Sequence, residues 1–104
     1  MKRIALLVVY LGEIPNYIHL FLKSCEYQKN IDFFFFTNWD WSIPPIVKNI
    51  KINVIDNLYF NKLASQKCGL NIEIKKGYKL CDMKPAWPHI FEDYLGEYEF
   101  VGWC

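Results

Sequence analysis

The stretch RIALLVVYL (residues 3–11) is a continuous run of aliphatic and β-branched side chains that follows a single arginine. Charged residues do not alternate with the apolar ones, so the pattern predicts a strand buried on both faces. Gly12 and Pro15 come next and end the strand. A strand that is covered on both faces favours a parallel sheet with helices on either side of it.

The segment NYIHLFLKSCEYQ (residues 16–28) predicts a helix with Asn16 as its N-cap. This helix leads to a second apolar run, IDFFFFT (residues 31–37), which predicts another buried strand. The helix face that we expect to be buried has side chains at three- and four-residue spacing, and they are Tyr17, Leu20, Phe21 and Ser24.

The rest of the chain continues this alternation of helices and strands, which predicts βαβ units. We therefore expect an α/β fold, with a Rossmann-like, mostly parallel sheet of about four strands flanked by helices, in one domain over residues 1–104. We expect an edge or half-exposed strand at about residues 50–55, followed by a helix from about Asn57 to Lys67 with Gly69 as its C-cap. A helical segment then runs from Tyr78 to Leu95 and is interrupted by Pro85 and Pro88. The last element is a strand in EYEFVGWC (residues 97–104).

The composition is that of a folded domain. The chain has 104 residues, of which 53% are hydrophobic and 22% charged, and this fits one domain with a modest core. A formal net charge of +1 gives no electrostatic footprint for nucleic acid, and no apolar run approaches the roughly 20 residues of a membrane span. The cysteines are widely spaced, with no Cys-x-x-Cys pair, so we expect no zinc site; they are Cys25, Cys68, Cys81 and Cys104. Because the sequence does not predict a secretion signal, we expect reduced thiols and a cytoplasmic protein.

Ligands of parallel α/β sheets bind beyond the carboxyl ends of the strands. This rule singles out YLGEIPN (residues 10–16), TNWDW (residues 37–41) and whatever follows Cys104. The usual phosphate-binding loops are missing, because the chain has neither Gly-x-Gly-x-x-Gly nor Gly-Lys-Ser/Thr. A Gly-x-Ser-x-Gly elbow is missing too, which excludes hydrolases of that kind.

The loop TNWDW has side chains that suit a nucleoside. Thr37 and Asn38 offer hydrogen bonds at a strand end, and Asp40 offers a carboxylate for ribose hydroxyls. Trp39 or Trp41 offers a face on which a base can stack. The structural alternative is that the tryptophans cover the core while Asp40 caps a turn.

The segment KKGYKLCDMKPAW (residues 75–87) concentrates charge. Lys79 and Asp82 are neighbours if this segment is helical. A lysine at the cleft holds a diphosphate as a point charge, and an aspartate orients the lysine. The alternative is a solvated ion pair of little energetic value.

Several segments, taken in order, resemble the N-terminal half of a glycosyltransferase-like family of bacterial capsular and surface polysaccharide synthesis. They are YLGEIPNY, FLKSCEYQKNIDFFFFTN, YKLCDMKPAW and IFEDYLGEYEFVGWC, and together they span essentially the whole chain. The resemblance implies a GT-A fold, here expected to be incomplete. In that family the strand equivalent to EFVGWC runs into an Asp-x-Asp motif, so we expect that motif directly after Cys104.

The resemblance implies a nucleotide-diphosphate sugar donor, most naturally a uridine diphosphate sugar, and a saccharide acceptor. In the full-length family the Asp-x-Asp motif holds Mg²⁺ or Mn²⁺, so no metal ligand and no catalytic residue is assigned to this chain, which we expect to be inactive alone. The residues that the resemblance implies at the nucleotide are Tyr10, Leu11 and Gly12 in the turn beside it, Thr37, Asn38 and Asp40 at the base and ribose, and Lys79, Asp82 and Lys84 near the diphosphate.

Two other classes of function stay open. A small, non-catalytic α/β interaction module would leave Lys79 and Asp82 as a surface ion pair. A flavodoxin-like cofactor binder would need a phosphate loop, which the sequence does not have. A sheet that is cut at its last strand exposes apolar surface and a strand edge, so we also expect self-association.

Overall fold

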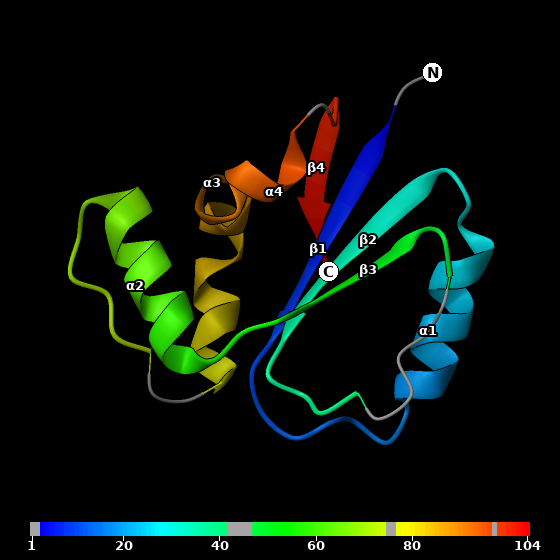
Figure 1. The fold of residues 1–104 in the computed structure, drawn as a ribbon, viewed down its shortest axis with the longest axis horizontal. Coiled ribbons are helices and arrows are strands. Elements are labelled where there is room, and N and C mark those ends of the chain that lie inside the picture. The colour runs from blue at the N-terminus through cyan, green and yellow to red at the C-terminus, as the bar shows by residue number, and fades with distance from the viewer. Residues whose placement is uncertain (1–2, 42–46, 75–76, 97) are drawn as a thin grey trace.

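The computed structural model describes residues 3–41, 47–74, 77–96 and 98–104. The strands of this part form one all-parallel sheet in the order β3-β2-β1-β4, so the fold is α/β, as predicted. Along the chain the elements are β1 (Ile4–Tyr10), α1 (Ile18–Tyr27), β2 (Ile31–Thr37), β3 (Ile50–Val54), α2 (Asn57–Cys68), the 3₁₀ helix η1 (Gly77–Ala86), α3 (Trp87–Ile90), α4 (Glu92–Leu95) and β4 (Phe100–Trp103) (Figure 1).

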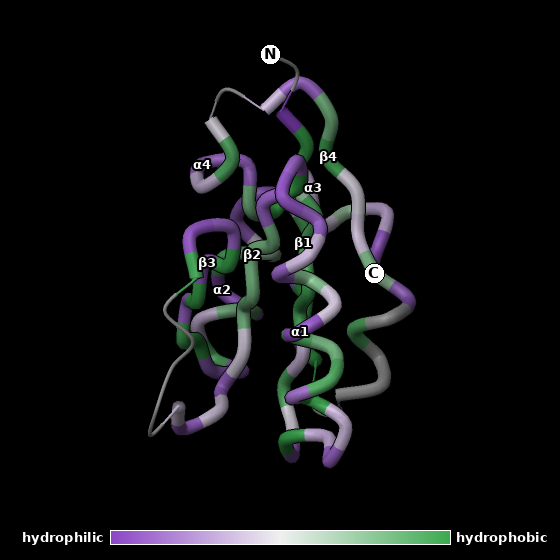
Figure 2. The backbone as a smooth tube through the Cα atoms, turned by 90° about the vertical axis from the view of Figure 1, so that its right-hand side faces the viewer, coloured by the Kyte–Doolittle hydropathy of each residue, from purple (hydrophilic) through white to green (hydrophobic). Residues whose placement is uncertain are grey.

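The apolar run that opens the sequence lies in the middle of the sheet. Ile4 of β1 is aligned with Ile31 of β2 on one side and with Phe100 of β4 on the other. Figure 2 shows β1 as a hydrophobic stretch that passes through the molecule. The expectation for β3 is confirmed as well, because β3 pairs only with β2 in the described sheet and forms one of its edges.

Helices cover both faces of the sheet (Figure 1). The FFFF run of β2 serves both faces, because alternate side chains of a strand point in opposite directions. On the face covered by α1, the buried side chains are Ile18, Cys25, Phe33, Phe35, Trp39 and Ile50. On the face covered by α2, η1, α3 and α4, the cluster includes Leu7, Val9, Leu11, Phe34, Phe36, Ile55, Phe60, Leu80, Trp87 and Phe91.

The predicted start of α1 is wrong, and its predicted buried face is right only for Phe21, whose ring lies 5.9 Å from that of Phe35 between centroids. The helix begins at Ile18, after Tyr17, and no side chain caps its first turn. The backbone makes this turn without a capping side chain, because the Ile18 N–H donates to the carbonyl of Pro15. Ile18 and Cys25 are the buried residues of this helix, whereas Leu20, expected on the buried face, is 75% exposed.

Helix α2 has a defined signal at each end. At its start, the Asp56 carboxylate accepts a hydrogen bond of 2.7 Å from the backbone N–H of Tyr59. At its end, Gly69 adopts a φ of 69°, which confirms this glycine as the predicted C-cap. The Asp56 cap therefore fixes the start of α2 directly after β3, and Gly69 fixes its end.

The expected helical segment from Tyr78 to Leu95 is divided into η1, α3 and α4. Pro85 lies in η1 and Pro88 lies near the start of α3, so the breaks fall around the prolines. Among the described residues, no helix combines the length and the hydropathy that are needed to cross a membrane.

Candidate functional site

The turns that follow β1 and β2 are tied together at the carboxyl end of the sheet. The backbone N–H of Gly12 donates a hydrogen bond of 3.0 Å to Oδ1 of Asn38. Gly12 has a φ of 152°, which a residue with a side chain rarely adopts. The structure thus brings together Gly12 and Asn38, two of the residues that the family resemblance implies at the nucleotide.

Aromatic side chains pack beside this tie. The ring of Trp39 lies 5.4 Å from that of Tyr10 and 5.2 Å from that of Trp41, measured between centroids. The indole N–H of Trp41 donates to the hydroxyl of Thr37 over 3.1 Å. Trp39 is only 4% exposed and belongs to the core on the α1 face, so the structural alternative holds for most of its surface.

Residues of this loop line a groove that we call the tryptophan groove. It has a volume of about 590 Å³ and lies at the carboxyl ends of β2 and β3. The indole Nε1 of Trp39 is buried and has no hydrogen-bond partner within the part of the chain that the structure describes. A buried donor without a partner costs free energy, so this N–H lowers the stability of the loop rather than serving the fold. The lining residues are Asn38, Trp39, Asp40, Trp41, Ile52 and Val54.

Two residues assigned to the nucleotide by sequence lie beneath the surface instead. Thr37 is fully buried, its hydroxyl accepts the bond from Trp41, and its carbonyl accepts a bond from the N–H of Ile55. The side chain of Leu11 lies in the core on the α2 face. Both residues therefore shape the backbone of the site rather than present a side chain to a ligand.

Lys84 of η1 lies apart from this loop, next to the end of β4. Burial raises the pKa of the Cys104 thiol, and the nearby Lys84 ammonium opposes this shift. Lys84 thus lies close to the carboxyl end of β4, and its Nζ is 6.0 Å from the centre of the Trp87 ring. Asp82 is exposed, and the side chain of Lys79 lies outside what the structure describes, so the pairing of these two residues stays a prediction.

A second groove, which sequence reasoning missed, lies beside the first one. It has a volume of about 460 Å³, and we call it the tyrosine groove because the hydroxyls of Tyr59 and Tyr94 are 2.6 Å apart in its wall. One signal could have located it, since Asp56 follows an edge strand and precedes a helix. The lining residues are Asn38, Asn53, Val54, Ile55, Asp56, Tyr59 and Tyr94.

Metal ligands do not gather in either groove. Within the described ranges, no group of three or more His, Cys, Asp or Glu side chains is arranged to hold a metal ion. We therefore derive no chemistry through a metal ion in either groove.

Comparison with protein families gives one match, over residues 6–104, to a family of unknown function, DUF6625. The match covers nearly the whole sequence, so the chain belongs to this family. No curated protein and no solved structure matches the chain significantly.

Proposed function

We propose that this chain is the donor-binding part of a GT-A-like glycosyltransferase and that the tryptophan groove holds the nucleoside of a uridine diphosphate sugar. The observation that carries the proposal is the groove itself, which lies beyond the carboxyl ends of parallel strands, where α/β folds bind ligands. Its wall combines indole faces, a carboxylate and an amide, which is the chemistry that a base and a ribose require.

Each polar group of the groove has a distinct role in this proposal. The exposed Asp40 carboxylate accepts hydrogen bonds from the ribose hydroxyls. Asn38 keeps its Oδ1 bonded to Gly12, and its NH₂ group, which has no partner among the described residues, donates to the ligand. Trp41 is half-buried and supplies the stacking surface for the base.

The diphosphate then extends toward the end of β4. Lys84 is the cation that the structure locates there, and it binds phosphate oxygens as a point charge. Asp82 and Lys79 are the further residues of this proposed phosphate site. We assign donor binding to this chain and no catalytic residue. A nucleotide-sugar enzyme would work in the cytoplasm, where Cys25, Cys68 and Cys104, free thiols in the structure, stay reduced.

Titration of the purified chain with uridine diphosphate tests the proposal, with tryptophan fluorescence as the readout. We expect saturable quenching, because Trp39 and Trp41 line the groove. Asp40→Asn should weaken binding about tenfold, because a hydrogen bond to a charged group is lost. Glu26→Gln is the matched control, since Glu26 is an exposed carboxylate on α1 that does not line the groove.

The outcome also separates this proposal from its alternative. If a folded sample shows no response to uridine diphosphate or to its sugar conjugates, the donor-binding proposal fails. A non-catalytic α/β interaction module would then be the better description. Equal affinity of the Asp40→Asn and wild-type proteins would instead remove the groove from the proposal, even if a nucleotide binds elsewhere.

A further inference from the structure

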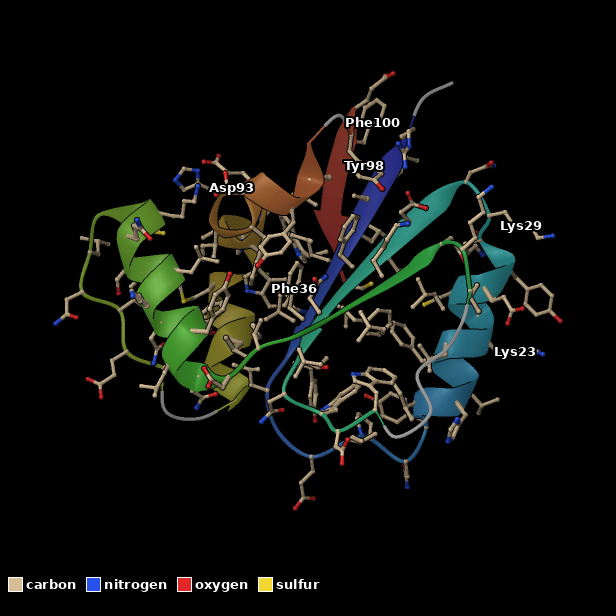
Figure 3. All side chains as sticks on the ribbon, in the orientation of Figure 1. Lys23, Lys29, Phe36, Asp93, Tyr98 and Phe100 are labelled. Atoms are coloured by element: carbon tan, nitrogen blue, oxygen red, sulfur yellow. The ribbon has the colours of Figure 1, made fainter. Side chains whose placement is uncertain are left out.

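The tyrosine groove faces the opposite side of the sheet from the tryptophan groove. Asn53 in its wall is aligned with Phe36, whose side chain lies in the core on the α2 face, so both point toward that face. Figure 3 shows Phe36 in the interior between β2 and the helices of this face. The two grooves meet at Asn38 and Val54, which line both of them.

The hydroxyl pair in the tyrosine groove is held by the core beneath it. The ring of Tyr94 packs against Phe36, at 5.1 Å between centroids, and against Phe91, at 6.2 Å. Tyr59 is in the first turn of α2, where its N–H is bound by the capping Asp56. The core therefore holds the ring of Tyr94, and the hydroxyl bond to Tyr94 holds the side chain of Tyr59. Tyr59 remains 41% exposed and Tyr94 37% exposed, so a ligand meets a preformed surface.

The charge of the tyrosine groove excludes several ligand classes. Asp56 is the one charged residue in its described wall, and no lysine, arginine or histidine lines it. A phosphate or carboxylate ligand would meet a negative charge without a compensating cation. A divalent cation requires more oxygen ligands with negative charge than one carboxylate provides. The groove therefore suits an uncharged polar ligand.

The hydrogen-bonding groups of the groove match a ring that carries several hydroxyls. Asp56 uses Oδ1 for the helix cap and keeps Oδ2 as an acceptor, and Asn53 offers both a donor and an acceptor. One tyrosine hydroxyl donates to the other, which leaves one proton and several lone pairs for a ligand. The bond with Tyr59 raises the pKa of Tyr94 to about 12.

We propose that the tyrosine groove binds an uncharged saccharide, with its hydroxyls on Asp56, Asn53 and the tyrosine pair. Exposed Val54 provides an apolar contact for the C–H face of the sugar. The identity of the ligand as a saccharide rests on the proposed function. If the tryptophan groove binds the nucleoside of the donor, then either the sugar of the donor or a second sugar must bind close to that groove. Either source presents the same neutral hydroxyls to the groove.

NMR titration of the ¹⁵N-labelled chain with neutral methyl glycosides tests this inference. We use the methyl glycosides of glucose, galactose, mannose and N-acetylglucosamine at millimolar concentrations. The expected result is a shift of the backbone amides of Val54–Tyr59 and of Tyr94 by at least one of these sugars. Tyr94→Phe keeps the ring and removes the hydroxyl, so it should weaken binding about fivefold. Tyr27→Phe, on exposed Tyr27 of α1, is the matched control.

Uridine monophosphate in the same samples separates this inference from the proposed function. Shifts of the Trp39 and Trp41 indole signals report the tryptophan groove. If the sugar binds and the nucleotide does not, the donor proposal fails and the saccharide site stands. If no glycoside shifts the amides of the tyrosine groove, the saccharide site is refuted.

The source of the sugar is resolved by a uridine diphosphate sugar. If uridine diphosphate glucose shifts Tyr94 while uridine diphosphate does not, the groove holds the sugar of the donor. If a methyl glycoside binds to the same amides when the donor is already bound, the groove holds a separate acceptor. Both results support the saccharide site.

Discussion

The two ends of the sheet use polar side chains in different ways. At the amino end, Arg3 donates to Asp32 over 2.8 Å, and the hydroxyl of Tyr98 donates to the same carboxylate. Figure 3 shows Tyr98 at this end, close to the start of β1. At the carboxyl end, the NH₂ group of Asn38 and the indole N–H of Trp39 have no partner among the described residues.

The amino end contains a cavity too, with a volume of about 640 Å³. Its wall includes Asn49, whose NH₂ group donates to the carbonyls of Cys25, Gln28 and Ile31 over 2.9, 3.1 and 3.2 Å. Asp32 in the same wall is also bonded within the protein. The size of a cavity is therefore a poor guide to function, because at this end the polar groups already stabilise the fold.

The largest effect on stability is expected at the amino end, for Asn49→Ala. This change removes the two N–H groups that the three carbonyls share, so the free energy of unfolding should fall by about 2 kcal/mol, near 1 kcal/mol for each lost N–H donor. Urea unfolding measures it. Asn30→Ala, at an exposed asparagine of the same cavity, is the control and should change little. A loss below about 1 kcal/mol would contradict the structural role of this end.

A smaller loss is expected for Tyr98→Phe. The Tyr98 hydroxyl donates to Asp32 and accepts from Arg3. Because the Arg3–Asp32 ion pair is partly exposed, the free energy of unfolding should fall by only about 1 kcal/mol near neutral pH. Burial and the bond to Asp32 raise the pKa of Tyr98 from 10.0 to about 12. The native state thus holds this proton more tightly than the unfolded state does.

The pH dependence of unfolding sharpens this test. The contribution of Tyr98 is present below pH 10 and should be lost as the pH rises to about 12, because ionisation then removes the donated proton. Tyr94, whose pKa is also raised to about 12, is common to both proteins. The difference in the free energy of unfolding between wild type and Tyr98→Phe therefore reports the contribution of Tyr98 alone. A difference that stays constant from pH 9 to about pH 12 would disprove this linkage.

The smallest effect on stability is expected at the carboxyl end, for Asn38→Ala. The bond to the Gly12 N–H is exposed, so its loss should cost about 0.5 kcal/mol in the free energy of unfolding. Nucleotide affinity should fall about fivefold, since one hydrogen bond to the ligand is removed. Asn71→Ala, at an exposed position outside both grooves, is the control. A destabilisation equal to that of Asn49→Ala would abolish the contrast between the two ends.

The strands of the sheet could be predicted because their signals are local. The apolar run of β1 and the FFFF run of β2 have no alternation, and both strands are central. The capping glycine of α2 was predictable for the same reason, because a left-handed residue after a helix favours glycine. The face of α1 was not predictable, since Leu20 and Ile18 are equally apolar and only packing against the sheet selects Ile18.

The candidate site divides in the same way. The polar loop after β2 could be placed at the carboxyl end of the sheet from sequence, because the apolar run of the strand ends where the polar loop begins. The burial of Thr37 could not be predicted, since it depends on the bond from Trp41 and on the neighbouring β3. The pairing of Tyr59 with Tyr94 joins residues 35 positions apart, and no local pattern contains that contact.

Asn38 and Val54, the shared wall of the two grooves, have a thermodynamic consequence. A ligand that fixes or displaces Asn38 from one side changes the free energy of binding on the other side. By linkage this effect is reciprocal, so each ligand alters the affinity of the other by the same factor. Two molecules that meet at one asparagine would bind in a coupled rather than an independent way, and the sign of the coupling would decide whether each one strengthens or weakens the binding of the other.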